Sequence, residues 1–402
     1  MKRIVSLITV IAMLLTLCVA FTGCGDKNTA ETDGIKVGFI FLHDENSTYD
    51  KNFIDAATAA TEALGLKADQ VMFKTNIPES SACYEAAAEL VDAGCSLVFA
   101  DSFGHEDFMI QAAKEFPEVT FCHATGTKAH TENLPNFYNA FASIYEGRFL
   151  AGVVAGLKLN EMIENGKITE AEAKMGYVGA FPYAEVKSGL TSYYLGARYV
   201  CPSVTMDVKY TNSWFDIAAE KETANALIAG GCVLISQHAD SEGAPKACEE
   251  AGVPNVAYNL DTREWGPNTA LISSKINWEP YFKHIITAVS EGTEIEQDFC
   301  KGIKDDVVQL IGMNDKTVAE GTAEKVEEIK AKIVSGELKV FDTATFTVEG
   351  KTLTEYMADV DSDANFTPDT NVVSDGYFHE SEMRSAPYFD VIIDGITEKQ
   401  LI

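Results

Sequence analysis

The sequence predicts an α/β protein with two lobes, each a doubly wound parallel sheet covered by helices. Short apolar runs alternate with amphipathic stretches along most of the chain, which is the pattern of repeated strand–helix units. The alternation runs from residue 36 to residue 159 and starts again at residue 175. The chain has 402 residues, 46% of them hydrophobic, which is enough for two domains with separate cores.

The first series opens with the apolar run KVGFIFL at residues 36–42, which predicts a buried strand followed by a polar loop. Residues 52–64 are alanine-rich, space their apolar side chains as a helix does, and stop at Gly65. The same reasoning predicts strands at residues 71–73, 96–100, 119–123 and 136–141, and helices at residues 81–92, 107–116 and 147–159.

The second series repeats the alternation. It predicts strands at residues 175–179, 204–210, 232–236, 255–258 and 270–273, and helices at residues 185–199, 215–229, 244–251 and 278–291. A highly charged surface helix is expected at 322–334, a hairpin at 340–350 and an acidic loop at 359–374. We therefore expect a first lobe of residues 35–157 plus about 290–340, a second lobe of residues 158–289, and a C-terminal extension, 341–402, whose placement the pattern leaves open.

The first residues carry the features of an export signal. Lys2 and Arg3 precede an uncharged, mostly apolar run, and small residues then lead to Cys24. The cysteine at this point resembles a bacterial lipobox, which implies cleavage after residue 23 and a lipid on Cys24. An ordinary signal peptide with a chance cysteine is the alternative. We expect a lipoprotein signal peptide at 1–23, a flexible tether at 24–34 and an extracytoplasmic protein anchored to the cell membrane by lipid.

The charge of the chain argues against nucleic acid as a partner. The formal net charge is −30, and removal of residues 1–23 takes away Lys2 and Arg3 and no acid, giving −32. Such a surface repels phosphate backbones. Seven cysteines remain besides Cys24 and the one in the signal; they are widely spaced, odd in number and without a C-x-x-C pair. They are expected to be free and buried rather than disulfide-bonded or metal-bound.

Candidate site residues follow from the rule that ligands of open α/β sheets lie beyond the carboxyl ends of the strands. The expected strand ends carry aromatic rings and neutral or acidic hydrogen-bonding groups. They are Thr48, Tyr49, Ser102, Phe103, Phe181, Trp214, His238, Asp240, Asn259 and Asp261. Such groups suit a flat, neutral, polar heterocycle, and no glycine-rich cradle or cationic cluster suits phosphate. The alternative is that single aromatics at strand ends belong to the core, and that Asp50 and Asp216 cap helices.

The stretch ISQHADSEGA, residues 235–244, contains three ionisable residues in five positions and could indicate chemistry. The chain has neither of the two-histidine helical zinc motifs and no G-x-S-x-G nucleophile motif. His238 could also be a neutral, hydrogen-bonded histidine at the end of a buried strand. We therefore interpret the stretch as part of a binding site, and we expect neither a metal nor a cofactor.

Several long runs resemble the basic membrane protein (BMP) family of bacterial lipoproteins, which are substrate-binding proteins of ABC importers. The runs are FPEVTFCHATG (116–126), YEGRFLAGVVAG (145–156), GYVGAFPYAEVKSGLTSYYLGAR (176–198), NSWFD (212–216) and ISQHADSEGAPKA (235–247). The resemblance covers roughly residues 36 to 310. It implies a type I periplasmic-binding-protein fold with a ligand in a hinged cleft, an ABC permease as partner, and a purine base or nucleoside as ligand. The protein is expected to be a monomer and not an enzyme.

Within that family the chain looks most like members that bind a free purine base. The nucleoside-binding branch has an aromatic residue where this chain has Ser47, with Tyr49 nearby as a possible substitute. That branch also places a lysine on the ribose, and the alignment puts Ile276 there, with Lys275 one residue away. A one-residue shift in a strand reverses the face, so either assignment stays open.

The resemblance also implies roles for the candidate residues. Trp214 and Phe103 would stack on the ligand or form its walls, and Tyr49 would close over it from the first lobe. His238 would orient Asp240 or the ligand. Hydrogen bonds to ring nitrogens or exocyclic groups would come from Ser102, Asp240, Asn259 and Asp261. A nucleoside-hydrolysing enzyme, or a sensor subunit that presents its ligand to a membrane kinase, is the alternative on the same fold.

Overall fold

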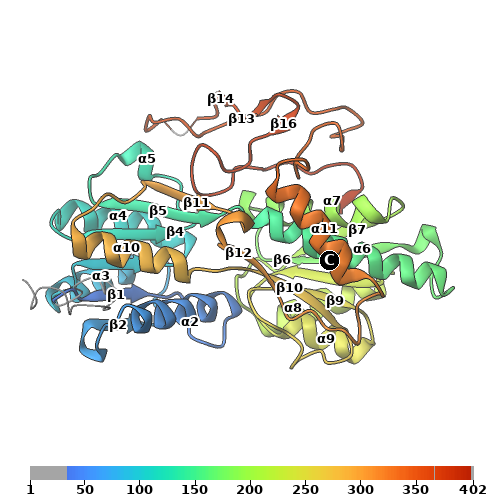
Figure 1. The fold of residues 1–402 in the computed structure, drawn as a ribbon, viewed down its shortest axis with the longest axis horizontal. Coiled ribbons are helices and arrows are strands. Elements are labelled where there is room, and N and C mark those ends of the chain that lie inside the picture. The colour runs from blue at the N-terminus through green and yellow to red at the C-terminus, as the bar shows by residue number, and fades with distance from the viewer. Residues whose placement is uncertain (1–33, 366, 400–402) are drawn as a thin grey trace, which may run out of the picture.

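The computed structural model describes residues 34–365 and 367–399. The predicted signal peptide, Cys24 and all but the last residue of the tether lie outside the described residues. Figure 1 shows two lobes side by side, with the C-terminal part of the chain lying across both. None of the described helices combines the length and the apolar character needed to traverse a bilayer.

The first lobe is built on a six-stranded parallel sheet with the order β11-β5-β4-β3-β1-β2. Its central strands are buried on both faces, which explains their continuous apolar sequences. The strands are β1 (Val37–Ile40), β2 (Val71–Lys74), β3 (Leu97–Ala100), β4 (Thr120–Ala124), β5 (Phe137–Ala142) and β11 (Asp298–Lys301). The helices are α2 (Thr48–Ala63), α3 (Ser81–Asp92), α4 (Glu106–Glu115), α5 (Ala129–Glu132) and α10 (Glu279–Glu291).

The second lobe has a seven-stranded sheet with the order β12-β10-β9-β8-β6-β7-β17, in which only β12 runs antiparallel among the described strands. The strands are β6 (Lys174–Gly179), β7 (Thr205–Tyr210), β8 (Leu234–His238), β9 (Asn255–Tyr258), β10 (Ala270–Ile276), β12 (Val308–Ile311) and β17 (Ile396–Glu398). The helices are α6 (Ile144–Glu164), α7 (Ala184–Val200), α8 (Ile217–Ala229), α9 (Gly243–Ala251) and α11 (Thr322–Val334). The prediction of two parallel-sheet lobes is confirmed.

The chain passes between the lobes three times, after β5, after β10 and after β11. These crossings change the predicted lobe boundaries. α6 packs closely against α7 in the second lobe, because Gly152 and Gly196 let the two backbones approach: an added Cβ at either would lie 2.0 or 1.9 Å from a carbonyl oxygen of the other helix. α10 packs on α2 in the first lobe, whereas β12 and α11 belong to the second. The lobe boundaries therefore differ from the expected divisions at residues 157 and 289, and of residues 290–340 the part with β11 belongs to the first lobe and the part from β12 onward to the second.

The C-terminal extension is mostly irregular, with short strands β13 (Met357–Ala358), β14 (Thr370–Asn371), β15 (Val373–Ser374) and β16 (Tyr377–Phe378). The hairpin predicted at 340–350 is wrong, because Asp342 pairs with Tyr377 instead and Val348 pairs only with Lys351. The seven cysteines are free as predicted; six are buried and Cys300 is partly exposed.

Candidate ligand-binding site

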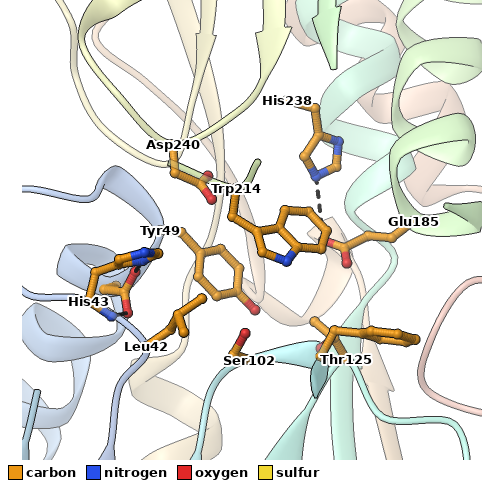
Figure 2. Close-up of a pocket in the computed structure, with 11 residues that line it drawn as sticks. Leu42, His43, Tyr49, Ser102, Thr125, Glu185, Trp214, His238 and Asp240 are labelled. Carbon is orange, nitrogen blue, oxygen red and sulfur yellow. Dashed lines mark hydrogen bonds and ion pairs between the residues drawn. The ribbon is translucent and has the colours of Figure 1, made fainter. Parts of the chain in front are cut away.

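A cavity lies between the carboxyl ends of the two sheets. Figure 2 shows its walls. The residues that line it are Leu42, His43, Tyr49, Asp50, Ser102, Phe103, Thr125, Glu185, Trp214, His238 and Asp240. Among the described residues, no lysine or arginine lines the cavity. The walls therefore combine aromatic rings with acidic and neutral hydrogen-bonding groups.

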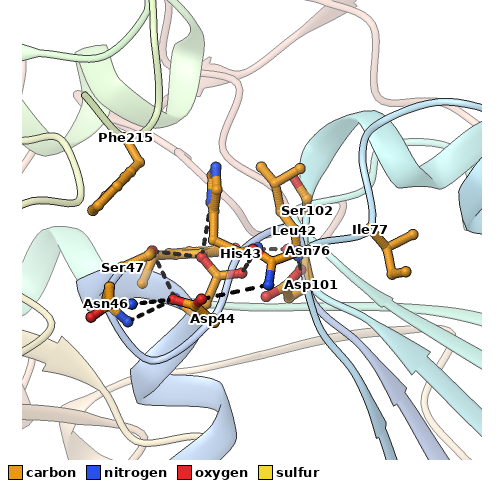
Figure 3. A network of polar contacts seen from close by, with 12 residues as sticks. Leu42, His43, Asp44, Asn46, Ser47, Asn76, Ile77, Asp101, Ser102 and Phe215 are labelled. Carbon is orange, nitrogen blue, oxygen red and sulfur yellow. Dashed lines mark hydrogen bonds and ion pairs between the residues drawn. The ribbon is translucent and has the colours of Figure 1, made fainter.

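The first lobe supplies a rigid loop between β1 and α2. Ser47 is the N-cap of α2, and its hydroxyl donates to Asp50 Oδ2 at 2.5 Å. Asp50 also accepts the backbone N–H of His43 at 2.7 Å. Figure 3 shows His43 and Ser47 within the polar network of this loop. Burial opposes ionisation of Asp50, but these hydrogen bonds lower its pKa and keep the carboxylate charged. Tyr49 is fixed beside this loop because its hydroxyl donates to the carbonyl of Asp101 at 2.9 Å.

The second lobe supplies the residues after β8. The Asp240 N–H donates to the carbonyl of Trp214 at 2.9 Å, which joins the loops that follow β7 and β8. The Asp240 carbonyl accepts the N–H of Thr48 from the first lobe at 2.8 Å. The backbone at Asp240 is thus held from both lobes, and the structure represents the closed arrangement of the cleft.

Aromatic side chains form one wall of the cavity. Trp214 contacts Phe181 edge-on at 5.0 Å, and Tyr183 stacks on Phe181 at 5.1 Å. Phe103 approaches Tyr183 from the other lobe at 5.5 Å, although 41% of its surface stays exposed. Figure 2 shows the Trp214 indole and the Tyr49 ring directed toward the same space. A planar ligand between them would gain stacking contacts on both faces.

The carboxyl group of Asp240 is directed at the cavity and is only 4% exposed. Within the described part of the chain, no hydrogen bond engages its oxygens. Burial, followed by the negative charges of Glu220, Asp50 and Glu185, raises the pKa of Asp240 well above its ordinary value. Burial therefore favours the protonated form of this carboxyl, which can donate one hydrogen bond and accept another.

His238 is held in place beside Glu185 and close to the buried guanidinium of Arg148. Its Nε2 is 3.4 Å from Glu185 Oε1, and its ring meets the ring of Tyr258 at 4.9 Å. The buried guanidinium of Arg148 stacks on that tyrosine at 3.6 Å and donates to the carbonyl of Gln237 at 3.1 Å. Burial and the nearby Arg148 cation lower the pKa of His238, so the imidazole is neutral. It can orient a ligand but carries no charge to attract one.

Ser102 completes the polar wall from the first lobe. Its hydroxyl donates to Glu79 Oε1 at 2.7 Å, and its carbonyl oxygen lies 2.7 Å from Nε2 of His123. Because the hydroxyl proton is already used, Ser102 can offer its oxygen only as an acceptor toward the cavity.

The structure brings together six of the ten predicted site residues as lining residues: Tyr49, Ser102, Phe103, Trp214, His238 and Asp240. Thr48 and Phe181 do not line the cavity but contact residues that do, through the Asp240 carbonyl and the Trp214 ring. Asp216, by contrast, accepts the N–H of Ala219 and caps α8, as the alternative interpretation stated.

Asn259 and Asp261 do not belong to the lining, and their predicted place in the site is corrected. Asp261 is on the surface and forms a bidentate ion pair with Arg263, with contacts of 2.5 to 3.0 Å. Asn259 is buried with a positive φ of 69°, and its N–H donates to the carbonyl of Ser274. Both residues follow β9, as the strand-end rule requires, but neither side chain lines the cavity.

Neither Lys275 nor Ile276, the two candidates for the ribose-binding lysine position, reaches the cavity. The strand continues to Ile276, beyond the predicted end at residue 273, and Lys275 pairs with Gln309 on β12. Ile276 is buried in the core, whereas the half-buried Lys275 lies near Asp55 and Glu279. Neither side chain lines the cavity.

Leu42, His43, Asp50, Thr125 and Glu185 line the cavity but were not among the predicted site residues. Leu42, His43 and Asp50 lie in the loop after the first strand, and Thr125 directly follows β4, so the strand-end rule could have included them. Glu185 lies in the first turn of α7 and gave no such signal. Its place in the site depends on how α7 packs.

Glu220 supports the loop after β8 and provides a test of its electrostatics. Its carboxyl accepts the N–H groups of Ser241 at 3.2 Å and Asp216 at 3.3 Å. Burial raises the pKa of Glu220 to about 7. The folded protein binds this proton more tightly than the unfolded chain does. The protonated Glu220 therefore contributes to the free energy of unfolding fully below about pH 4.5, and this contribution is lost as the pH rises through 7.

Glutamine does not titrate, so Glu220→Gln lacks this loss. Between pH 5 and pH 8 we therefore expect the free energy of unfolding of the wild type to fall by on the order of 2 kcal/mol more than that of Glu220→Gln. Urea unfolding at both pH values measures the difference. An identical pH dependence in both proteins would show that Glu220 ionises without cost in the fold.

Comparisons with known proteins agree with this architecture. Residues 39–344 match the family described as Bmp, ABC transporter substrate-binding protein PnrA-like. A purine-binding protein of Brucella abortus, BAB2_0673, is 34% identical over 310 residues, which cover 76% of this chain and 83% of that protein. A putative ABC transporter glucose-binding protein of Haloferax volcanii, TsgA13, is 33% identical over 250 residues, covering 62% of this chain and 60% of that protein.

The fold also resembles solved structures of solute-binding proteins. The ABC transporter solute-binding protein of Aeropyrum pernix superposes with a TM-score of 0.65 at 21% identity, covering 76% of this chain and 93% of that one. This likeness concerns the fold alone.

Proposed function

Because this chain belongs to the Bmp family of PnrA-like substrate-binding proteins of ABC transporters, we propose that its ligand is a purine base or a closely related heterocycle. The ligand would bind in the closed cleft between the two lobes. The single observation that carries the proposal is a cavity walled by Trp214 and Tyr49, with the buried carboxyl of Asp240 directed into it. The relative from Brucella abortus, described as purine-binding, supports the same ligand class.

The chemistry of the walls matches the edges and faces of a purine. A purine ring is flat, uncharged near neutral pH and has hydrogen-bond donors and acceptors around its edge. Aromatic walls favour the ring faces, and the carboxylic acid of Asp240 can donate to one ring nitrogen while accepting from a neighbouring N–H. Ser102 offers an acceptor and His238 a neutral imidazole. A phosphorylated ligand is disfavoured because the acidic lining would repel it.

A free base is favoured over a nucleoside because no lysine or arginine of the described residues lines the cavity. The lysine that the resemblance associates with ribose has no counterpart in the lining, since Ile276 is in the core and Lys275 lies beside α10.

We further propose that the protein is a monomeric, extracytoplasmic lipoprotein anchored through Cys24, which delivers its ligand to ABC permease subunits. Ligand binding would favour the closed lobes, because Trp214 and Asp240 come from one lobe and Tyr49 and Ser102 from the other. A nucleoside-hydrolysing enzyme would be revealed by release of free base from nucleosides. A sensor subunit would be encoded beside a membrane kinase rather than a permease and an ATPase.

A thermal-shift screen tests the ligand class. The panel contains adenine, guanine, hypoxanthine, xanthine and their nucleosides, together with glucose, because one similar protein is described as glucose-binding. A true ligand at 100 times its Kd should raise the free energy of unfolding by about 2.7 kcal/mol. We expect at least one base to shift the melting temperature more than its nucleoside. A shift by glucose alone, or by nothing in the panel, would contradict the purine proposal.

A further inference from the structure

The C-terminal extension is anchored mainly on the second lobe. It leaves α11, which packs on α6, and it ends in β17, which pairs with β7. Between these points the chain crosses the top of the molecule and reaches the first lobe, as Figure 1 shows. The family match ends at residue 344, so nearly all of this segment lies outside the part shared with that family.

The contact with the first lobe centres on Asp298 in β11. Its Oδ1 accepts both the N–H of Ser385 at 3.0 Å and the hydroxyl of Ser385 at 3.1 Å. Nearby, the Sγ of Cys300 lies 3.6 Å from the hydroxyl of Ser381. Hydrogen bonds to a carboxylate are stronger than those between neutral groups, and Asp298 accepts two of them in a half-buried place.

The same segment is tied to the second lobe at the start of α7. Lys187 forms an ion pair with Asp390 at 2.6 Å, and the hydroxyl of Ser188 donates to the buried carboxyl of Glu380. Residues 380–390, which we call the strap, therefore contact the first lobe in their middle and the second lobe at both ends.

The strap also closes one side of the ligand cleft. A second cavity shares Phe103, Thr125 and Glu185 with the ligand cavity, and its lining contains Arg384 and Pro387 of the strap. Only four residues lie between the first-lobe contact at Ser385 and the second-lobe contact at Asp390, and the fully extended segment spans at most about 18 Å. The length of this segment therefore limits how far the two anchors can separate before one of them breaks.

We propose that the strap is a latch: it holds the two lobes in the closed arrangement through Ser385 and Asp298, and opening of the cleft requires this contact to break. The latch concerns the regulation of the proposed ligand site and in that respect rests on the proposed function. The latch itself is a property of the ligand-free protein. It predicts that closure is partly built into the fold, and that ligand leaves only as fast as the latch opens.

Small-angle X-ray scattering of the ligand-free chain tests the latch. Asp298→Ala removes both hydrogen bonds and should lower the closed-to-open ratio roughly tenfold, seen as a larger radius of gyration than in the wild type. Ser385→Ala, which keeps the N–H contact and leaves Asp298 in place, should give an intermediate value. If a purine binds, its dissociation rate should rise in the same order.

The matched control is Asp394→Ala. Asp394 also accepts one hydroxyl and one backbone N–H, from Thr347 at 2.5 Å and Gly350 at 2.8 Å, but both partners lie within the extension. This control should scatter like the wild type. Equal radii for Asp298→Ala and wild type would overturn the latch, as would equal expansion of Asp298→Ala and Asp394→Ala. Because the scattering is measured without ligand, it tests the latch even if no purine binds to the protein.

Discussion

Replacing Asp240 with alanine should weaken purine binding by about 2–3 kcal/mol, whereas replacing it with asparagine should leave the affinity at pH 7 close to that of the wild type. The reason is the protonation state of the carboxyl group. Burial and three neighbouring acids raise the pKa of Asp240 and favour its protonated form, which offers one donor and one acceptor, as an amide does. Alanine offers neither and leaves the ligand edge unpaired.

Isothermal titration calorimetry with the best ligand of the screen measures these affinities. The wild-type affinity should fall as pH rises through the pKa of Asp240, because ionisation removes the donor, and Asp240→Asn should not share that loss. Asp261→Ala is the matched control, since Asp261 follows a strand of the same lobe but is ion-paired with Arg263 outside the cavity. If Asp240→Asn binds as weakly as Asp240→Ala, the carboxyl acts as an anion and the neutral-acid interpretation fails.

Replacing Trp214 with alanine should weaken binding by about 1–3 kcal/mol, the range found when a base loses an aromatic stacking partner. The indole lines the cavity and is held in place by Phe181 and by the backbone contact with Asp240. Trp214→Phe should recover part of the loss, because a smaller ring still offers a stacking face.

Trp265→Ala is the control for this experiment, because Trp265 is a half-buried tryptophan of the second lobe that does not line the cavity. Its affinity should equal that of the wild type. Unchanged affinity in a folded Trp214→Ala protein would remove the indole from the ligand site. A similar loss in both variants would indicate a general effect on the second lobe rather than stacking.

The predictable part of the fold is local. The run at 36–42 and the helix after it could be predicted because buried parallel strands are continuously apolar and helices space their apolar residues regularly. β11 and β12 were missed, since their short sequences, DFCK and VQLI, interrupt the apolar residues with charged or polar ones. The lobe to which α6 belongs depends on close glycine contacts with α7, and such contacts leave no periodic signal.

The candidate site divides in the same way. Tyr49, Ser102, Trp214 and Asp240 could be identified because parallel strands deliver their carboxyl ends to one edge of a sheet. Asp261 follows the same rule and still points elsewhere, because the ion pair with Arg263 holds its carboxylate at the surface. Glu185 could not be identified, since it reaches the cavity from a helix whose orientation is set by tertiary packing.

The sequence by itself determined the two-lobe α/β class, the family resemblance and the residue types at the strand ends, because periodicity and short motifs are properties of neighbouring residues. Only the tertiary structure decided which strand ends converge on the cavity. It also decided that β10 continues to Ile276 with Lys275 outside the lining, and that the extension reaches back over both lobes. These outcomes depend on contacts between residues far apart in the chain, such as Ser385 and Asp298, and no local pattern encodes them.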